Sequence, residues 1–190
     1  MKFAKVALLV AVGLTTVGAM AGEITDSNVY ATGVVNTALG VGNAKAFQNI
    51  GVAEQNGKIQ RTTVIVNGAN NLAVGVLSTA RQNVGHVKDN GRISDSIIIG
   101  TAITNTAGGL YSTAEQSIGF ARNNGRVENS FVQATYASNN AGGVDATARQ
   151  EIGGATGYGL LRNATVNALG AVNSAGGIMA TAEQRIGVAR

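Results

Sequence analysis

The chain has 190 residues, of which 45% are hydrophobic and 13% are charged, and its formal net charge is +4. It has no cysteine, proline or tryptophan, one histidine and 27 glycines. Without cysteine there can be no disulfide framework and no thiolate metal site, and the single His86 excludes a histidine-rich metal site. A net charge this small does not indicate binding to nucleic acid.

The first 21 residues have the pattern of a secretory signal peptide. Lysines at positions 2 and 5 precede an apolar run over residues 6–17, and Ala19-Met20-Ala21 then matches a cleavage site. The run is shorter than the roughly 18 residues that a membrane-spanning helix needs. We therefore expect cleavage after Ala21, export of residues 22–190, and a short N-terminal segment over residues 22–25.

Residues 26–190 consist of five imperfect repeats of 34 residues. Each repeat has a glutamine that is followed two positions later by Ile or Val and then by Gly. The rows are 26–59, 60–93, 94–127, 128–161 and 162–190. A second block, Asn-x-Ala-x-Gly, also recurs, but in the first row it lies one position early, which places a one-residue slip between Gly40 and Gln48.

The rows are predicted to form strands, although helical tetratricopeptide repeats have the same length. They lack the Trp, Tyr and Pro landmarks of that repeat and contain β-rich runs such as Thr-Val-Ile-Val at 63–66. We expect about two short strands per row, separated by glycine-rich bends. The predicted fold class is all-β: a repetitive β-solenoid, or cross-β stack, of five repeats.

Rows stacked about 4.8 Å apart would place equivalent side chains above one another. Amide side chains in such a column donate to and accept from their neighbours, which satisfies them when they are buried. The predicted stacking ladders are Gln48, Gln82, Gln116, Gln150 and Gln184; Asn36, Asn71, Asn105, Asn139 and Asn173; and Ile50, Val84, Ile118, Ile152 and Ile186. A further apolar column is predicted from Tyr30, Val64, Ile98, Val132 and Val166.

One column alternates in charge, which predicts attraction between rows. This charge ladder consists of Phe47 followed by Arg81, Glu115, Arg149 and Glu183. Two more opposite-charge pairs are Glu54 with Lys88 and Glu151 with Arg185.

Asn-Gly pairs occur in three rows and predict tight turns, because both residues accept positive φ. The turn glycines are Gly57, Gly91 and Gly125, and the fourth row has Tyr158-Gly159 instead. The residues that follow these glycines, Lys58, Arg92 and Arg126, form a column of like charges that we expect water to screen.

Residues 35–43, Val-Asn-Thr-Ala-Leu-Gly-Val-Gly-Asn, resemble the V-N-x-A-x-G-x-x-N core of the Fap functional-amyloid repeats. Later rows keep only the first half of that pattern, and the composition is also similar to curli subunits, whose repeats are shorter. The resemblance implies a secreted subunit of biofilm fibrils, main or nucleating, with a related fibril subunit and an outer-membrane export apparatus as partners. The missing Cys-x-x-Cys pair departs from the major Fap subunit and favours the nucleating role.

We therefore expect a secreted structural protein that self-assembles into amyloid-like fibrils outside the cell or on its surface. The last row has the pattern of the interior rows instead of a polar cap, so its edge is expected to template a further chain. The alternative is a secreted monomeric β-solenoid that acts as an adhesin or surface-binding module. Its face would be the column Thr79, Thr113, Thr147 and Thr181, which Lys45 interrupts.

An enzyme is not expected, because the 10 acidic residues are spread over the rows instead of forming a catalytic pair. The sequence therefore assigns no catalytic residue, metal ligand or cofactor-binding residue. It also assigns no nucleic-acid partner, and the chain itself is the main partner that we expect.

Overall fold

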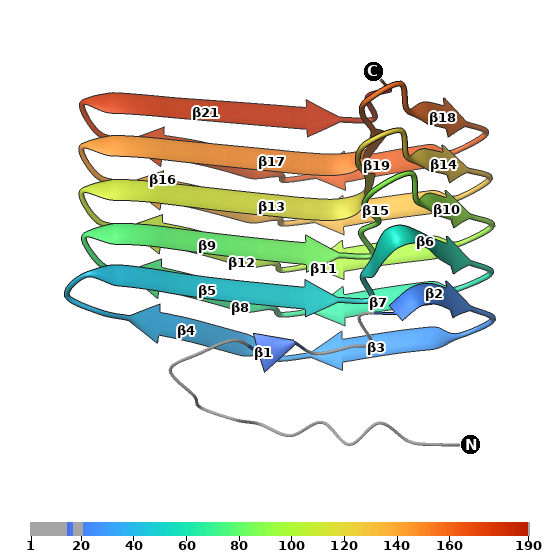
Figure 1. Ribbon diagram of the computed structural model, residues 1–190, viewed down its shortest axis with the longest axis horizontal. Coiled ribbons are helices and arrows are strands. Elements are labelled where there is room, and N and C mark those ends of the chain that lie inside the picture. Colours follow the sequence, from blue (N-terminus) through green and yellow to red (C-terminus); the bar gives the residue numbers. More distant parts are fainter. Residues whose placement is uncertain (1–14, 17–20, 190) are drawn as a thin grey trace.

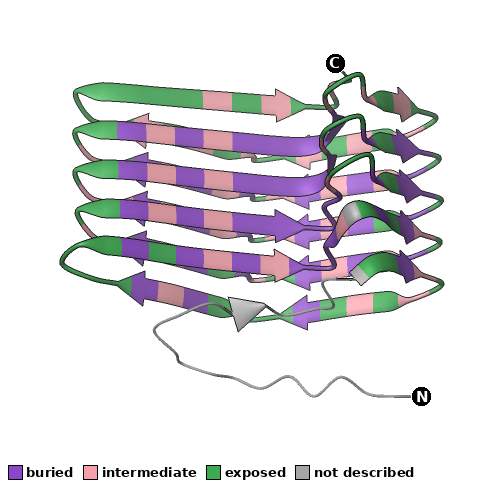
Figure 2. Cartoon of the chain, viewed as in Figure 1, coloured by how far each residue is buried: buried purple, intermediate pink, exposed green. Residues whose placement is uncertain are grey.

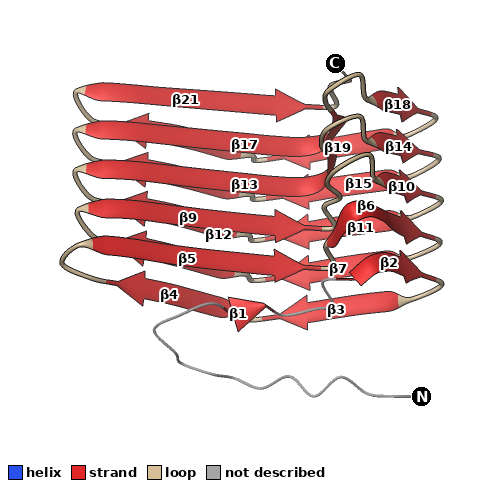
Figure 3. Ribbon diagram, viewed as in Figure 1, coloured by secondary structure: helices blue, strands red, loops and turns tan. Residues whose placement is uncertain are grey.

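The computed structural model describes residues 15–16 and 21–189, and this part of the chain contains strands and no helix. The strands wind into a β-solenoid of about five turns with repeats of about 34 residues (Figure 1, Figure 3). The predicted fold class is therefore confirmed. The predicted signal peptide lies largely outside the described residues, which include only Thr15, Thr16 and Ala21 of it.

Each turn of the solenoid, called a coil from here on, contains four strands. Coil one has β2 (Ala21–Thr25), β3 (Asn28–Thr32), β4 (Val35–Leu39) and β5 (Asn43–Ile50); coil two has β6 (Ala53–Gln60), β7 (Thr63–Asn67), β8 (Asn70–Val74) and β9 (Leu77–Val84). Coil three has β10 (Arg92–Ser94), β11 (Ile97–Thr101), β12 (Thr104–Gly108) and β13 (Tyr111–Ala121); coil four has β14 (Arg126–Glu128), β15 (Phe131–Thr135), β16 (Ser138–Gly142) and β17 (Asp145–Ala155). Coil five has β18 (Leu160–Arg162), β19 (Thr165–Leu169), β20 (Val172–Gly176) and β21 (Met179–Ile186), and β1 (Thr15–Thr16) pairs with β5.

The prediction of about two strands per row was wrong, because two corners of each coil carry no constant glycine. These corners use residues with positive φ, and several of them have side chains: Arg61 (47°), Ala102 (53°) and Tyr136 (54°). The Arg61 column otherwise holds Asp or Asn, and the column of Ala102 and Tyr136 otherwise holds Gly, so neither corner has one constant residue type for the repeat pattern to reveal.

Equivalent strands of successive coils pair in parallel and form the four sides of the solenoid. One side has the order β1-β5-β9-β13-β17-β21, and the other three have five strands each. Most pairs are offset by one 34-residue repeat, as for Gln116 and Gln82. Between coils one and two the offset is 35 before the bend, as for Asn36 and Asn71, and 34 after it. Coil one therefore has one extra residue in the bend over residues 40–42.

This slip overturns one predicted apolar column. Val29 pairs with Val64, whereas Tyr30 pairs with Ile65 and is 62% exposed. Alternate residues of a strand face opposite sides, so a shift of one position turns Tyr30 outward. The observed column is Val29, Val64, Ile98, Val132 and Val166.

The core is built from columns of like side chains that alternate with outward-facing residues (Figure 2). In β13, for example, Ala114, Gln116 and Ile118 are buried. Isoleucine and valine fill one cluster, and alanines fill a second cluster between the sheet of β4 and that of β5. The small alanine side chains let these two sheets approach closely.

The turn glycines are required for a different reason from the predicted one. Only the asparagine of each pair has positive φ: 62° at Asn56, 63° at Asn90 and 63° at Asn124. A Cβ on the glycine would instead collide with the chain four residues earlier, at 2.7 Å from Ala53 for Gly57, 2.3 Å from Val87 for Gly91 and 2.5 Å from Ala121 for Gly125. Tyr158-Gly159 forms the equivalent turn in coil four, with Tyr158 at a φ of 63°.

Candidate functional site

The five glutamines form a hydrogen-bonded ladder on the inner face of the sheet that contains β5 and β21. Each Nε2 donates to the Oε1 of the glutamine in the preceding coil, at 2.6, 2.9, 2.6 and 2.5 Å from Gln82 to Gln184. Most also donate to a backbone carbonyl, as Gln116 does to Ile103. Gln48, Gln82, Gln116 and Gln150 are fully buried. The ladder thus satisfies amides that water does not reach.

The five asparagines form a second ladder with the opposite direction of donation. Each Nδ2 donates to the Oδ1 of the asparagine in the following coil, at 2.8, 2.8, 2.7 and 2.7 Å from Asn36 to Asn173. The same nitrogen bonds two backbone carbonyls, which for Asn105 belong to Ala80 and Glu115. The two ladders therefore give the stack a chemical polarity along its axis.

The charge ladder is in register and consists of separate pairs. Arg81 Nε lies 2.7 Å from Glu115 and its guanidinium 5.6 Å from the Phe47 ring, while Arg149 Nε lies 3.2 Å from Glu183. Within the described residues no ion pair joins Glu115 to Arg149. Burial alone would raise the pKa of Glu183, but hydrogen bonds and charge from Arg185 and Arg149 outweigh it and lower the pKa. Partly exposed pairs like these contribute about 0–1 kcal/mol each.

Two buried glutamates each lie between two arginines, and of these four contacts the repeat spacing predicted only that of Glu151 with Arg185. Glu128 is contacted by Arg92 at 2.8 Å and by Arg162 at 3.1 Å, and its side chain is 3% exposed. Arg92 and Glu128 lie in neighbouring columns, so a search within one column cannot find their diagonal contact. Arg92 is thus paired, while Lys58, Arg92 and Arg126 lie in one exposed column as the repeat spacing predicted.

The second buried glutamate is Glu151, which is held by Arg122 at 2.5 Å and by Arg185 at 3.3 Å. The Arg185 contact and the bond between Lys88 and Glu54, at 3.0 Å, join the opposite charges that the sequence paired. The contact of Arg122 with Glu151 was not predicted, because Arg122 lies in the bend after β13 and Glu151 belongs to a different column.

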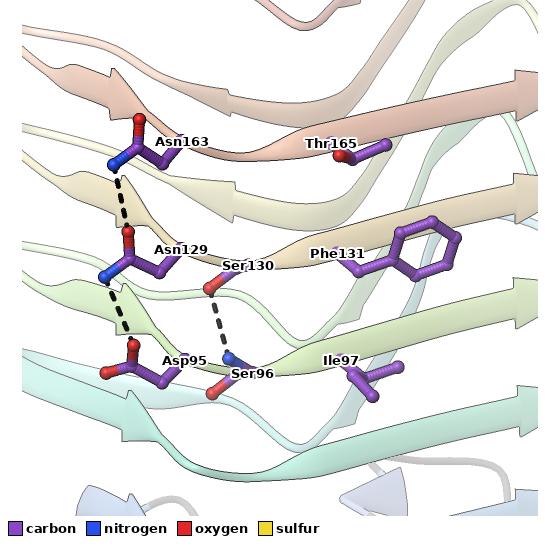
Figure 4. A pocket seen from close by; sticks show the side chains of 8 residues that line it. All are labelled: Asp95, Ser96, Ile97, Asn129, Ser130, Phe131, Asn163 and Thr165. Carbon is purple, nitrogen blue, oxygen red and sulfur yellow. Dashed lines mark hydrogen bonds between the residues drawn. The ribbon is translucent and has the colours of Figure 1, made fainter.

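A shallow groove runs along the corner between β10, β14 and β18 and the next sheet (Figure 4). Its polar side chains bond along the stack: Asn163 donates to Asn129 at 3.3 Å, and Asn129 donates to Asp95 at 3.2 Å. The groups therefore satisfy one another and do not converge on a common ligand position. The predicted threonine column is also in register and faces outward, with Thr113 beside Thr79 and Thr147.

His86 is fully buried, in register with Val52 and Phe120 of the adjacent coils. Neither ring nitrogen has a hydrogen-bond partner in the described structure. Burial lowers the pKa of His86 well below its ordinary value, and the cationic Arg122, Lys88 and Arg81 lower it further. The side chain therefore acts as a neutral ring in the core.

The ladders reach the outer edge of coil five without a covering layer. Ile118 is fully buried in coil three, whereas the equivalent Ile186 is 42% exposed. Gln184 and Ala182 are exposed as well, and Figure 2 shows green in β21 where the inner coils are purple. Among the described residues, no strand pairs with the outer edges of β18, β19, β20 and β21.

The described residues contain no cluster of three or more potential metal ligands of the His, Cys, Asp or Glu type. In the same part of the chain, no helix is long and apolar enough to cross a membrane. Comparisons with protein-family models, with curated proteins and with solved structures found no match to this chain.

Proposed function

We propose that the protein is a secreted structural subunit that self-assembles into cross-β fibrils by extending its own stack of coils. This proposal rests on the outer edge of coil five. Its side chains continue the columns of the inner coils, but a neighbouring coil covers them on one side only. An edge with unpaired backbone groups and exposed apolar side chains favours pairing with another chain.

The residue types in the columns support the addition of a second copy of the chain. A further coil would bury the apolar side chains Leu161, Val166 and Ile186, whose counterparts in coils three and four are fully buried. Complete burial of one aliphatic side chain contributes roughly 1.5–3 kcal/mol. Each added coil would also continue both amide ladders, so the gain repeats with every subunit.

The signal-peptide pattern of residues 1–21 supports a location outside the cell or on its surface. The resemblance of residues 35–43 to the Fap repeats supports a place in the biofilm matrix. On the same basis, we propose that the chain is a main or nucleating subunit that works with a related fibril subunit and an outer-membrane export apparatus.

Fibre diffraction tests this function. The chain beginning at Gly22 is purified from denaturant and left at rest in neutral buffer, with the full 190-residue chain in parallel. Filaments with a sharp meridional reflection near 4.7–4.8 Å are expected. A soluble, monodisperse β-rich monomer without that reflection would contradict the fibril function and favour the monomeric surface-binding module, for which the in-register threonine column is the candidate face.

A further inference from the structure

We infer, on the basis of the proposed fibril function, that copies of the chain join with one polarity: coil one of a second copy docks on coil five of the first. The junction would pair β21 with the second copy's β5 and continue the same register in the other three sheets. Gly187 would then lie against the second copy's Val29. The partner at this surface is thus another copy of the chain, in one defined orientation.

The amide ladders end in complementary groups at the two ends of the stack. At coil five the groups without a ladder partner are the Oε1 acceptor of Gln184 and the Nδ2 of Asn173, which donates only to the carbonyls of Ala148 and Glu183, because donation runs backward in one ladder and forward in the other. Coil one has the reverse set: the Nε2 of Gln48, which donates only to the carbonyls of Val34 and Asn70 at 3.4 Å, and the Oδ1 acceptor of Asn36. Stacking coil one on coil five continues both ladders without reversal.

The outline of a coil also excludes the opposite orientation. Its four strands are unequal, with 3, 5, 5 and 8 residues in coil five. A two-fold junction between identical ends would reverse the strand direction and misalign these sides, and it would face amide donors with donors. Only the head-to-tail arrangement matches all four edges in parallel.

The glycine after the apolar ladder residue provides the sharpest constraint on the junction. A Cβ on Gly119 would lie 2.5 Å from Val132 in the next coil, and a Cβ on Gly153 would lie 2.5 Å from Val166. A Cβ on Gly187 has nothing closer than 3.9 Å, because no coil follows in the described structure. A methyl group at 187 is therefore compatible with the isolated chain and collides with Val29 of a docked copy.

Charges at the two ends are complementary in this orientation. Arg162 would lie in the column next to the second copy's Glu23, and Glu183 next to the second copy's Lys45. Diagonal neighbours across parallel strands are within reach of such long side chains. Within the described residues Lys45 and Glu23 have no ion-pair partner in their own chain.

The docking edge of coil one is partly covered in the full chain. Thr15 and Thr16 of β1 pair there with Gln48 and Asn49, beneath β5 in Figure 1. Both threonines belong to the predicted signal peptide, so its removal would open this edge. Each test below therefore uses the full chain and the form that begins at Gly22.

The first experiment compares Gly187→Ala with Gly33→Ala in seeded elongation. Both positions have nearly the same φ, 61° and 62°, and a Cβ on Gly33 meets nothing within 4 Å. Ala102 and Tyr136 already occupy the Gly33 column, so the control substitution fits a stacked coil. We expect the Gly187→Ala chain to elongate about tenfold more slowly than the Gly33→Ala chain. The circular dichroism of both monomers should be unchanged. Equal elongation rates would overturn the inferred junction.

The second experiment uses the absence of native cysteine. Asn43→Cys and Met179→Cys chains are mixed, assembled and oxidised, since both positions are exposed and stacked partners about 4.8 Å apart satisfy disulfide geometry. Tyr111→Cys replaces Met179→Cys in the control, because residue 111 is exposed in the same column of an inner coil. We expect mixed 43–179 dimers and none between 43 and 111.

The outcomes separate the two proposals. Filaments that cross-link 43 to 43 or 179 to 179, or that give no 43–179 dimer, would overturn the polar junction and leave the fibril function standing. If neither form of the unsubstituted chain assembled, the fibril function would fail, and the junction with it. Filaments with 43–179 dimers and impaired growth of Gly187→Ala support the junction.

Discussion

Coil three and coil five are built from the same columns, yet their side chains are buried to different extents. Gln116 and Ile118 are fully buried, while Gln184 is exposed and Ile186 is 42% exposed. The two coils share the residues Ala-Glu-Gln at 114–116 and 182–184. The difference therefore arises from the neighbouring layer, which coil three has on both sides and coil five has on one side in the described structure.

A coil of this solenoid thus obtains its stability from its neighbours, as in other stacked repeat proteins. The same substitution should cost much more in coil three than in coil five of the isolated chain. Assembly should then raise the cost in coil five toward that in coil three. The predictions below test this comparison.

The largest difference is expected for the glycine that faces the next coil. Gly119→Ala adds a methyl group 2.5 Å from Val132 at a φ of 58°, so we expect a loss of about 3 kcal/mol or more in the free energy of unfolding. Gly187→Ala has a similar φ without the collision, and about 1 kcal/mol is expected. Urea denaturation of the unassembled chains measures both values. Equal losses would contradict the assigned role of the neighbouring coil.

The glutamine ladder should show the next largest difference. Gln116→Ala removes the acceptor of Gln150 and the donor to Gln82 in a fully buried column, and we expect about 3 kcal/mol of destabilisation. Gln184→Ala removes two bonds, to Gln150 and to the carbonyl of Ala171, but at an exposed end where water can replace them, and less than about 1 kcal/mol is expected. Thermal unfolding of the two variants measures this difference. An equal shift in Tm would show that the contribution of the glutamine ladder to stability does not depend on burial.

These columns are also the part of the fold that could be predicted from the sequence. The repeat spacing placed Gln48 to Gln184 in one column and Asn36 to Asn173 in another, because residues at equivalent positions of successive repeats stack on one another. It did not give four strands per coil, since the corner columns of Arg61 and Ala102 carry no constant glycine. The error at Tyr30 arose because the slip noted near Gly40 was not applied to the rest of coil one.

The candidate site was less predictable where contacts cross columns or depend on packing. The contact of Arg92 with Glu128 is diagonal, so spacing within one column carried no signal for it. The burial of His86 could not be predicted either, because it depends on its position between Val52 and Phe120 inside the stack.

His86 gives a pH-dependent test of the inner coils. Its pKa is lowered in the folded chain, so the unfolded chain binds a proton first as the pH falls. The free energy of unfolding therefore has its full value above the pKa of His86 in the unfolded chain, near 6.5. It decreases below that pH, by at most about 1.4 kcal/mol per pH unit. The control His86→Phe copies Phe120 of the next coil and should remove this part of the pH dependence between pH 7 and pH 5. An unchanged pH profile in the variant would show that His86 is not the group responsible.

The smallest effect is expected at the turn residue Arg126. It is exposed, and among the described residues it has no ion pair. Arg126→Ala should change the free energy of unfolding by less than about 0.5 kcal/mol and leave elongation unchanged. A loss as large as that of Gln116→Ala, in the same urea titration, would contradict the ladder account.

Amide hydrogen exchange tests the central claim most directly, because it reports the stability of each coil before and after assembly. In the unassembled chain we expect strong protection in β13 and weak protection in β21. In filaments, protection of β21 should rise to the level of β13. If β21 is already as protected as β13 in the monomer, or stays weakly protected in filaments, the outer edge of coil five is not where the chain associates.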